Sequence, residues 1–404
     1  MECAKCFLMK LQLTKTKTIE IGRKGGASSA KVDITGVELF SGDARGCPAV
    51  RICLKKRVWH LEAAGFVPPP AGELPEKWDD MPKQPKWEMP AAFQSPNAAL
   101  SVRSAQAIFA QATADSIVQD MARGLATQKA APVAEPEKKR FSVKRHEKPA
   151  AETAPAAAAK LPDFPPAGLA TSANGMRFTV KPIAEAGFHL EAALPEFQAL
   201  WLSRLLPEGR RPTACSVQVS DAALMASVLA QPAVAEANGN ALAVFVEAER
   251  VAFAGYKGGE PVLWRICPGS GGLRAMRAAV TRTLGVEASL VDSVLDDTLV
   301  DPRGALEPFL RPILDELELS RAYLADRHGI SSSRILLFGL PAGAKYWNEI
   351  AKDTHRLELV APKPFDGIVL PTKAGALDDA ATGADAAVFL PALGAALAAA
   401  EVTE

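Results

Sequence analysis

A segment without hydrophobic periodicity, from about Gln128 to Pro166, divides the chain. Alanine, proline, glutamate and lysine alternate there, and such a composition cannot bury enough apolar surface to offset the entropy lost on ordering. We therefore expect a disordered linker at 129–166 between an N-terminal lobe at 1–128 and a C-terminal lobe at 167–404. The linker carries a basic cluster that is either solvated or a docking or anionic-lipid patch: Lys138, Lys139, Arg140, Lys144, Arg145 and His146.

Composition limits the classes of partner. The 404 residues carry a formal net charge of +0 and 6% aromatic residues, so a nucleic-acid-binding surface is not expected. Six cysteines in a chain of this length, with no signal peptide, do not indicate a disulfide framework. The most apolar stretch, Ala384–Ala400, is mostly alanine and too short to span a bilayer, so we expect a packing helix. These features predict a cytoplasmic protein that does not insert into a membrane.

Three kinds of sequence precede the linker. From Val50 to Ala63 apolar residues alternate with basic ones, which predicts an antiparallel hairpin. Prolines recur from Gly65 to Pro96 around Trp78 and Trp87, which predicts an extended segment that serves as a structural strap or offers apolar anchors to a partner. From Ser101 to Leu125 apolar residues recur at helical spacing, which predicts an amphipathic helix.

The sequence after the linker alternates between strand and helix patterns. We expect three successive strands, a helix after a glycine run, a longer helix, a buried strand, a further helix and a short edge strand. The corresponding segments are Ala241–Val246, Val251–Ala254, Glu260–Cys267, Leu273–Leu284, Leu306–Ala325, Arg334–Phe338, a helix through Tyr346, Trp347 and Ile350, and Leu357–Val360. This alternation indicates an α/β fold.

Nothing in the chain forms a convincing catalytic motif. The five histidines are dispersed, and none lies in a zinc-protease or serine-hydrolase motif. Cys3 and Cys6 have the spacing of half a zinc ribbon, but Cys47 and Cys53 do not complete it. One acidic cluster has the spacing to hold a metal, although helix ends and caps explain it more simply: Asp292, Asp296, Asp297 and Asp301. We therefore assign no catalytic and no metal-binding residue.

Glycine-rich segments are the remaining candidates for a ligand site, because glycine lets the backbone approach a phosphate group closely. They are Gly22–Gly26, Gly269–Gly272 and Gly339–Gly343. None of them matches the P-loop or the dinucleotide-binding fingerprint. Their order among the expected strands and helices is more informative than any one of them.

The span Ala241–Ala399 resembles the second half of the actin-like fold in the PilM family of type IV pilus assembly proteins, relatives of the cell-division protein FtsA. The resemblance implies an α/β, ribonuclease H-like fold of two lobes, with mixed sheets flanked by helices and a disordered Pro/Ala-rich insert. Five segments carry the resemblance, in this order along the chain. They are a strand pair, the run Pro261–Gly269 entering a helix, the helix segment Ile313–Tyr323, the strand Arg334–Gly339 entering a glycine turn, and a closing strand and helix.

By this resemblance a nucleotide would be bound by four residues. Gly22 and Lys31 would lie at the phosphates, in a version of the family's first phosphate turn, and Gly339 and Gly343 at the adenosine. The segment Asp33–Gly36 is a competing alignment for the first phosphate turn.

The second phosphate turn departs from the family's Asp-x-Gly pattern, because this chain has Glu247-Ala248-Glu249. Glu249 would put a negative charge where a phosphate approaches. At an effective dielectric of about 20, two unit charges about 4 Å apart repel by about 4 kcal/mol. We therefore expect no ATP hydrolysis and no cofactor, with ATP and Mg²⁺ as the alternative.

The leading functional hypothesis is a cytoplasmic scaffold of a type IV pilus or type II secretion-like assembly platform. By resemblance it would bind the cytoplasmic tail of a membrane-anchored partner and so lie at the inner membrane. The alternatives are a nucleotide-dependent switch or ATPase of the actin-like superfamily, which would use Gly22, Lys31 and Gly339, and a binding module with an unrelated α/β fold. The sequence does not fix the partner's identity or the oligomeric state.

Overall fold

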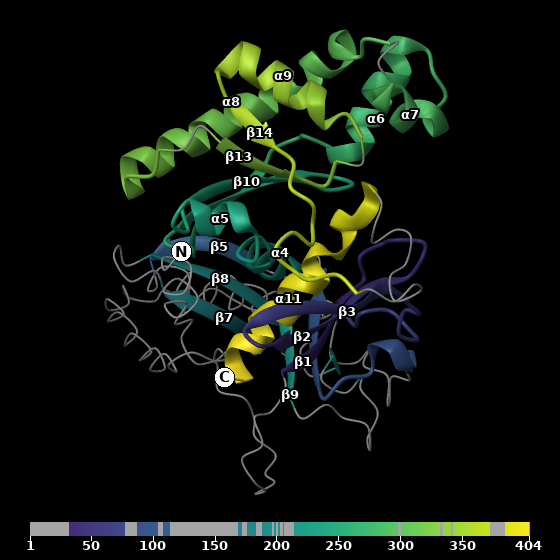
Figure 1. Cartoon of the computed structure of the whole chain (residues 1–404), viewed down its shortest axis with the longest axis vertical. Helices are drawn as coiled ribbons and strands as arrows, with labels where there is room; N and C mark the ends of the chain where they lie inside the picture. Colours follow the sequence, from purple (N-terminus) through teal and green to yellow (C-terminus); the bar gives the residue numbers. More distant parts are fainter. Residues whose placement is uncertain are drawn as a thin grey trace, which may run out of the picture.

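The computed structural model describes residues 32–76, 87–103, 108–113, 169–171, 176–182, 188–195, 198, 201–202, 205, 214–297, 300–331, 334–340, 342–371 and 384–403. The expected linker at 129–166 lies outside the described residues, as do Cys3, Cys6, Gly22, Lys31 and Trp78. Two mixed five-stranded sheets and one four-stranded antiparallel sheet organise the described part of the chain (Figure 1).

The first sheet begins with an antiparallel meander and continues with parallel strands. β1 pairs antiparallel with β2, β2 pairs antiparallel with β3, and on the other side of β1 the strands β4 and β9 run parallel to it. The order is therefore β3-β2-β1-β4-β9. The strands are β1 Asp33–Leu39, β2 Cys47–Lys55, β3 Val58–Val67, β4 Asn97–Val102 and β9 Ala214–Val219. The hairpin expected at Val50–Ala63 is confirmed as β2 and β3.

The second sheet repeats the same plan. Its order is β12-β11-β10-β13-β14, with an antiparallel meander over β10 to β12 and parallel strands β13 and β14 beside β10. The strands are β10 Ala241–Val246, β11 Val251–Lys257, β12 Glu260–Cys267, β13 Arg334–Phe338 and β14 Glu358–Val360. Two lobes built on one repeated strand order, each flanked by helices, form the actin-like fold, and the expected fold class is confirmed.

Helices cover the outer face of the second sheet, on the side away from the first (Figure 1). All three helices expected in this half are present, and their apolar faces share one core with the sheet. The elements are α6 Gly272–Leu284, the 3-10 turn η3 Ala288–Leu290, α7 Val291–Asp296, α8 Arg303–His328 and α9 Ala344–His355. In the part of the chain that the structure describes, no helix is both long and apolar enough to cross a membrane.

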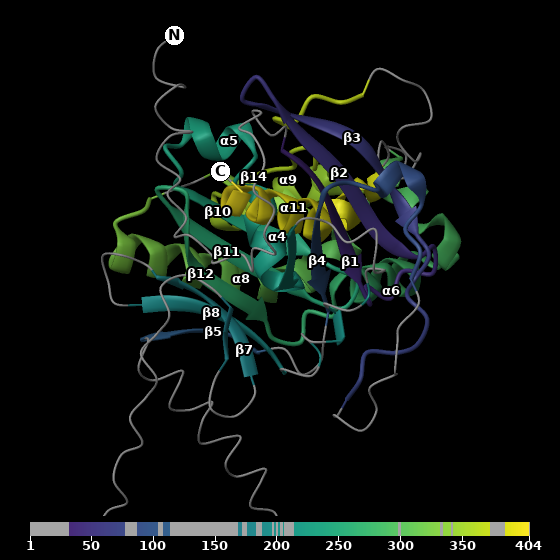
Figure 2. The ribbon, with the colours of Figure 1, turned by 90° about the horizontal axis from the view of Figure 1, so that it is seen from below.

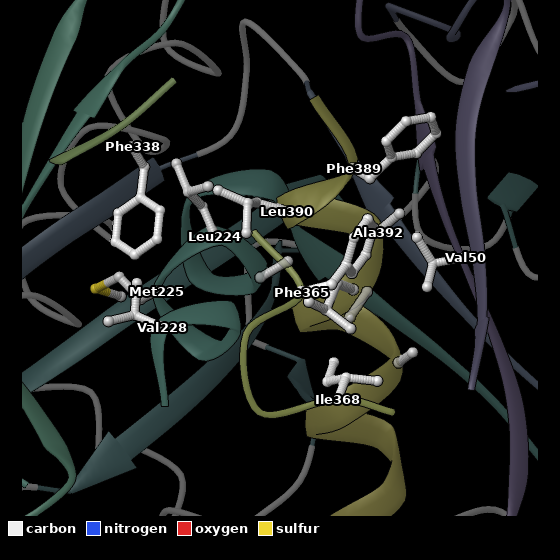
Figure 3. Packing of buried hydrophobic residues seen from close by; sticks show 14 of the residues in the cluster. Val50, Leu224, Met225, Val228, Phe338, Phe365, Ile368, Phe389, Leu390 and Ala392 are labelled. Atoms are coloured by element: carbon white, nitrogen blue, oxygen red, sulfur yellow. The ribbon is translucent and has the colours of Figure 1, made fainter. Parts of the chain in front are cut away.

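Two helices lie between the sheets: α4, Ser220–Val228, and α11, Leu390–Thr403. α11 follows the 3-10 turn η4, Ala384–Phe389, and the short helix α5, Pro232–Glu236, follows α4. Figure 3 shows Leu224 of α4 between Phe338 of β13 and Leu390 of α11, with Met225 and Val228 of α4 close to Phe338. One apolar core therefore runs from the first sheet through both helices to the second sheet. The packing helix expected near the C-terminus is confirmed.

Close backbone contacts of α11 with α4 and with β1 make this central layer possible. A Cβ atom added at Gly394 of α11 would lie 1.7 Å from the carbonyl oxygen of Ala223 in α4. A Cβ atom added at Gly36 of β1 would lie 1.9 Å from the carbonyl oxygen of Ala392. Only glycine allows such backbone contact, so these two positions set the place of α11 between α4 and the first sheet.

The division of the chain differs from the expected boundaries at 128 and 167. β9 and α11 lie after residue 167, yet β9 completes the first sheet and α11 packs against β1, β2 and β4. The first lobe is therefore assembled from both halves of the sequence. Hydrophobic patterns describe each element but not the sheet that it joins, which is why the boundary was misplaced.

A helix expected over Ser101–Leu125 is wrong where the structure describes that span. Only the first two residues of the span, Ser101 and Val102, belong to β4, whose residues 98–102 are all buried. Residues Ile108–Thr113 form β5, which pairs with β8 in the third sheet. The sheet, ordered β5-β8-β7-β6, lies beside β12 (Figure 2). Its other strands are β6 Leu169–Thr171, β7 Met176–Pro182 and β8 Phe188–Pro195.

The proline-rich segment contains a structural strap. Trp87 is buried in the core of the first lobe, and its Nε1–H donates to the carbonyl oxygen of Pro68 at 2.7 Å. The 3-10 turn η2, Ala91–Phe93, follows it, and Thr35 Oγ1 of β1 donates to the carbonyl oxygen of Phe93 at 2.8 Å. Trp87 is therefore unavailable as an anchor for a partner, and the strap interpretation holds for this residue.

Candidate functional site

Five charged side chains from both lobes meet at the carboxyl ends of the parallel strands of the first sheet. Glu38 lies near the end of β1, Arg103 directly follows β4, and Asp221 lies in the first turn of α4 after β9. Glu247 and Arg250 flank the turn between β10 and β11 of the second lobe. We call these five residues the interlobe ionic cluster. The carboxyl ends of parallel strands are where open α/β sheets bind their ligands, so this is the candidate site.

Glu247 is the centre of the cluster. Its Oε1 accepts a hydrogen bond from Arg103 Nη2, and its Oε2 accepts one from Arg250 Nε. Arg250 Nη2 and Nη1 also donate to the two carboxylate oxygens of Asp221, the latter at 3.3 Å. Arg103 Nη2 lies 3.4 Å from Glu38 Oε1. Arg103 therefore contacts Glu38 and Glu247, and Arg250 contacts Asp221 and Glu247, so both arginines share Glu247.

Burial sets the protonation of the acids in this cluster. Glu38 is only 2% exposed, and burial raises its pKa to about 7, with Glu247 also raising it and Arg103 opposing the shift. Burial would also raise the pKa of Glu247, but the charges of Arg103 and Arg250 outweigh it and hold that pKa below its ordinary value. The two glutamates of the cluster are therefore shifted in opposite directions, with the pKa of Glu38 raised and that of Glu247 lowered.

The raised pKa of Glu38 predicts a pH-dependent stability. Between about pH 4.5 and pH 7 the folded state holds a proton that the unfolded state has lost, so the free energy of unfolding falls as pH rises through this window. Glu38→Gln removes that proton exchange. Between pH 5 and pH 8 we expect wild type to lose roughly 2–3 kcal/mol relative to the Glu38→Gln variant in urea unfolding.

Glu249→Gln is the matched control, because Glu249 is an exposed acid in the turn between Glu247 and Arg250. Its unfolding free energy should follow the wild-type pH profile. Parallel profiles for wild type and Glu38→Gln would show that the carboxyl group of Glu38 does not exchange its proton in this window.

The backbone around the β10–β11 turn is fixed by the start of α6. The N–H groups of Leu273 and Arg274 donate to the carbonyl oxygens of Glu247 and Ala248 at 2.9 and 3.0 Å. A Cβ atom added at Gly272 would lie 2.1 Å from the carbonyl oxygen of Glu247. The glycine run Gly269–Gly272 therefore lets the helix start pack on the turn, and these two helix N–H groups are directed to the turn instead of to a ligand.

Glu249 has a different environment from the one expected. Its side chain is 58% exposed and forms an ion pair at 2.5 Å with Arg274, which is 79% exposed. An exposed, paired carboxylate does not produce a repulsion of about 4 kcal/mol toward a ligand, because solvent and the partner charge screen it. The expectation for Glu249 was wrong. Glu247, which the alignment placed at the family's aspartate, is the glutamate that the arginines bind.

Gly339 and Gly343 each have a structural reason to be glycine. Gly339, with φ of +91°, follows β13, and a Cβ atom there would lie 2.1 Å from the carbonyl oxygen of Val246. Gly343, with φ of +79°, caps the start of α9. Their roles at adenosine stay predictions, as do those of Gly22 and Lys31. The competing phosphate-turn alignment at Asp33–Gly36 is wrong, because these residues lie within β1.

Burial, ion pairing and helix capping account for the two described candidate cysteines and for two residues of the acidic cluster. Cys47 and Cys53 are buried, and burial is the main cause that raises the pKa of the Cys53 thiol to about 11. Asp292 pairs with Arg277 at 2.6 Å, and Asp301 Oδ1 accepts the Arg303 N–H at 3.0 Å at the start of α8. Among the described residues no group of three or more histidine, cysteine, aspartate or glutamate side chains is placed to hold a metal.

Sequence patterns did not identify Glu38, Arg103, Asp221 or Arg250 as site residues. At the fifth position they emphasised Glu249 instead of Glu247. Glu38, Arg103 and Asp221 belong to segments that carry no motif. Glu247 and Arg250 flank a two-residue hairpin turn, and opposite charges at such positions are the one local signal that was present.

No protein-family model matches the chain, and no curated protein is similar to it in sequence. Among solved structures, a PilM-PilN type IV pilus biogenesis complex is similar with a TM-score of 0.48 and 15% identity, over 92% of this chain and 99% of that one. A Bacteroides thetaiotaomicron protein with an actin-like ATPase fold and unknown function has a TM-score of 0.37 and 8% identity, over 85% and 96%. The cytoplasmic domain of EpsL, an inner membrane component of the type II secretion system of Vibrio cholerae, has a TM-score of 0.24 and 7% identity, over 58% and 71%. At these values the fold assignment rests on the repeated strand order.

Proposed function

We propose that this chain is a scaffold of a type IV pilus or type II secretion-like assembly platform that neither binds nor hydrolyses ATP. The observation that carries the proposal is Glu247, whose carboxylate is bound by Arg103 and Arg250 at the strand ends where the actin-like fold has its ligand site. The order of elements that resembles the PilM family gives the assembly role and the class of partner.

A nucleotide would have to break this arrangement in order to bind. A triphosphate brings further negative charge to a cluster that already has three carboxyl groups for two arginines. Taking the arginines from Glu247 leaves a buried carboxylate without its partners, which costs roughly 3–5 kcal/mol. That is a loss of about two to three and a half orders of magnitude in affinity. The energetics therefore favour a site closed by its own side chains.

The continuous core supports a platform of fixed shape. Trp264 of β12, Met225 of α4 and Leu393 of α11 belong to the same cluster of buried residues as Ile52 of β2. Opening the lobes would expose part of this core, at about 25 cal/mol for each Å² of apolar surface. A scaffold needs a constant shape, whereas a nucleotide switch needs two.

The partner in this proposal is a membrane-anchored assembly protein with a short cytoplasmic tail, such as the resemblance to the PilM family implies. The chain would then lie in the cytoplasm, at the inner membrane, held there by the partner. Its first lobe would offer the groove for the tail.

The test is capture of the tagged full chain from detergent-solubilised membranes of the native host, followed by mass spectrometry. We expect a pilus or secretion membrane protein to be enriched over an untagged lysate. Binding should then be reproduced with a synthetic peptide of that protein's cytoplasmic tail, and it should be unchanged by added Mg-ATP. Absence of every pilus and secretion component from the captured material would count against the proposal.

A further inference from the structure

The side chain of Glu247 is held as a bound anion would be. Its two oxygens accept hydrogen bonds from different guanidinium groups, Arg103 of the first lobe and Arg250 of the second. Its side chain is only 12% exposed, so these contacts are largely shielded from water. Charge-assisted hydrogen bonds from arginine to an oxyanion are the usual means by which proteins recognise carboxylates and phosphates.

Both arginines have a second anchor that does not depend on Glu247. Arg250 is paired with Asp221 at the start of α4, and Arg103 lies 3.4 Å from Glu38 of β1. Removal of Glu247 would leave the two guanidinium groups beside their other partners, Asp221 and Glu38. The arginines would stay near their positions, and the guanidinium N–H groups that now donate to Glu247 would lose their acceptor.

We propose that Arg103 and Arg250 form an oxyanion site that Glu247 occupies as a built-in ligand, and that a small carboxylate or phosphate ion binds there once Glu247 is removed. The same bonds latch the lobes together. Arg103–Glu247 and Arg250–Asp221 both run between the first and second lobes, so loss of Glu247 removes one of these two links.

The test is chemical rescue of the Glu247→Ala variant of the full chain. Thermal unfolding is measured at pH 7 and constant ionic strength, in chloride and with increasing acetate or inorganic phosphate. We expect the variant to melt at a lower temperature than wild type in chloride. Acetate and phosphate should raise its Tm in a saturable manner, while the Tm of wild type stays at its value in chloride.

Two further variants separate a specific site from a general salt effect. Glu249→Ala removes an exposed acid from the same turn and should show no rescue. Glu247→Ala combined with Arg103→Gln should bind acetate at least tenfold more weakly than Glu247→Ala alone. Equal rescue in wild type, or rescue that survives the loss of Arg103, would overturn the proposal.

If Glu247→Ala does not fold, Glu247→Gln keeps the volume of the side chain and removes its charge. A double-mutant cycle with Arg103→Gln should then give a coupling of tenfold or more in the folding equilibrium constant, and additive effects would overturn the proposal. The inference shares its site with the proposed function but uses no partner and no nucleotide. If the rescue fails, the proposed assembly role is not contradicted, because the capture experiment tests that role separately.

Discussion

Gly394→Ala is expected to lower the free energy of unfolding by roughly 3 kcal/mol, although it adds one methyl group in a helix. The reason is the crossing of α11 and α4, where the new Cβ atom would lie 1.7 Å from the carbonyl oxygen of Ala223 and 2.8 Å from the amide nitrogen of Ser227. These are backbone atoms, so no rotamer change relieves the overlap. The two helices must separate, and the central core between the sheets opens with them.

Gly304→Ala is the matched control for this substitution. Gly304 also lies in a helix, α8, and a Cβ atom there meets nothing within 4 Å. Alanine should stabilise that helix by roughly 0.5–1 kcal/mol, because glycine has the greater conformational freedom in the unfolded chain. Urea unfolding of both variants measures the two effects. A Gly394→Ala variant as stable as wild type would contradict the observed helix crossing.

Arg250→Met is expected to destabilise the fold by roughly 3–5 kcal/mol. Arg250 is paired with Asp221 and with Glu247, so its loss leaves Asp221 without this ion pair and Glu247 with Arg103 alone. Methionine has a similar length and apolar volume, so packing is largely kept and the charge is what changes. Urea unfolding at pH 7 measures the effect.

Arg274→Met provides the comparison for Arg250→Met. Arg274 is 79% exposed and paired with the exposed Glu249, and such surface pairs contribute about 0–1 kcal/mol. A large difference between the two variants is therefore expected. Equal and small effects would mean that the interlobe ionic cluster does not hold the lobes together.

The sequence predicts the second lobe well because its elements are local. The hairpin of β10 and β11 closes over two residues, and the glycine run before α6 marks the start of that helix within four positions. Strands and helices of this kind show their period in a short window. Their order also carries the resemblance that led to the two-lobed fold.

The first lobe is less readable because it depends on distant segments. β9 joins β4 across more than a hundred positions, and α11 returns from the end of the chain to cover β1. β4 is buried on both faces, so burial does not alternate along this strand. Periodicity does not contain the information that brings these segments together.

The candidate site shows the same limit. Arg103 and Glu247 are 144 positions apart, and neither stands in a motif. Glu249 stands where the resemblance implies a glycine, whereas Arg103 and Arg250 both contact Glu247. An ionic cluster formed between lobes is a tertiary property, and a single sequence gives no distance between its members.

The central claim is that the ligand site of this actin-like fold is closed by its own ion pairs. Thermal unfolding of the full chain with and without millimolar Mg-ATP, against matched MgCl₂ and ionic strength, tests it most directly. We predict no shift in Tm. A saturable rise, which for ligand at about 100 times its dissociation constant corresponds to about 2.7 kcal/mol of stabilisation, would contradict the claim and favour a nucleotide-dependent switch.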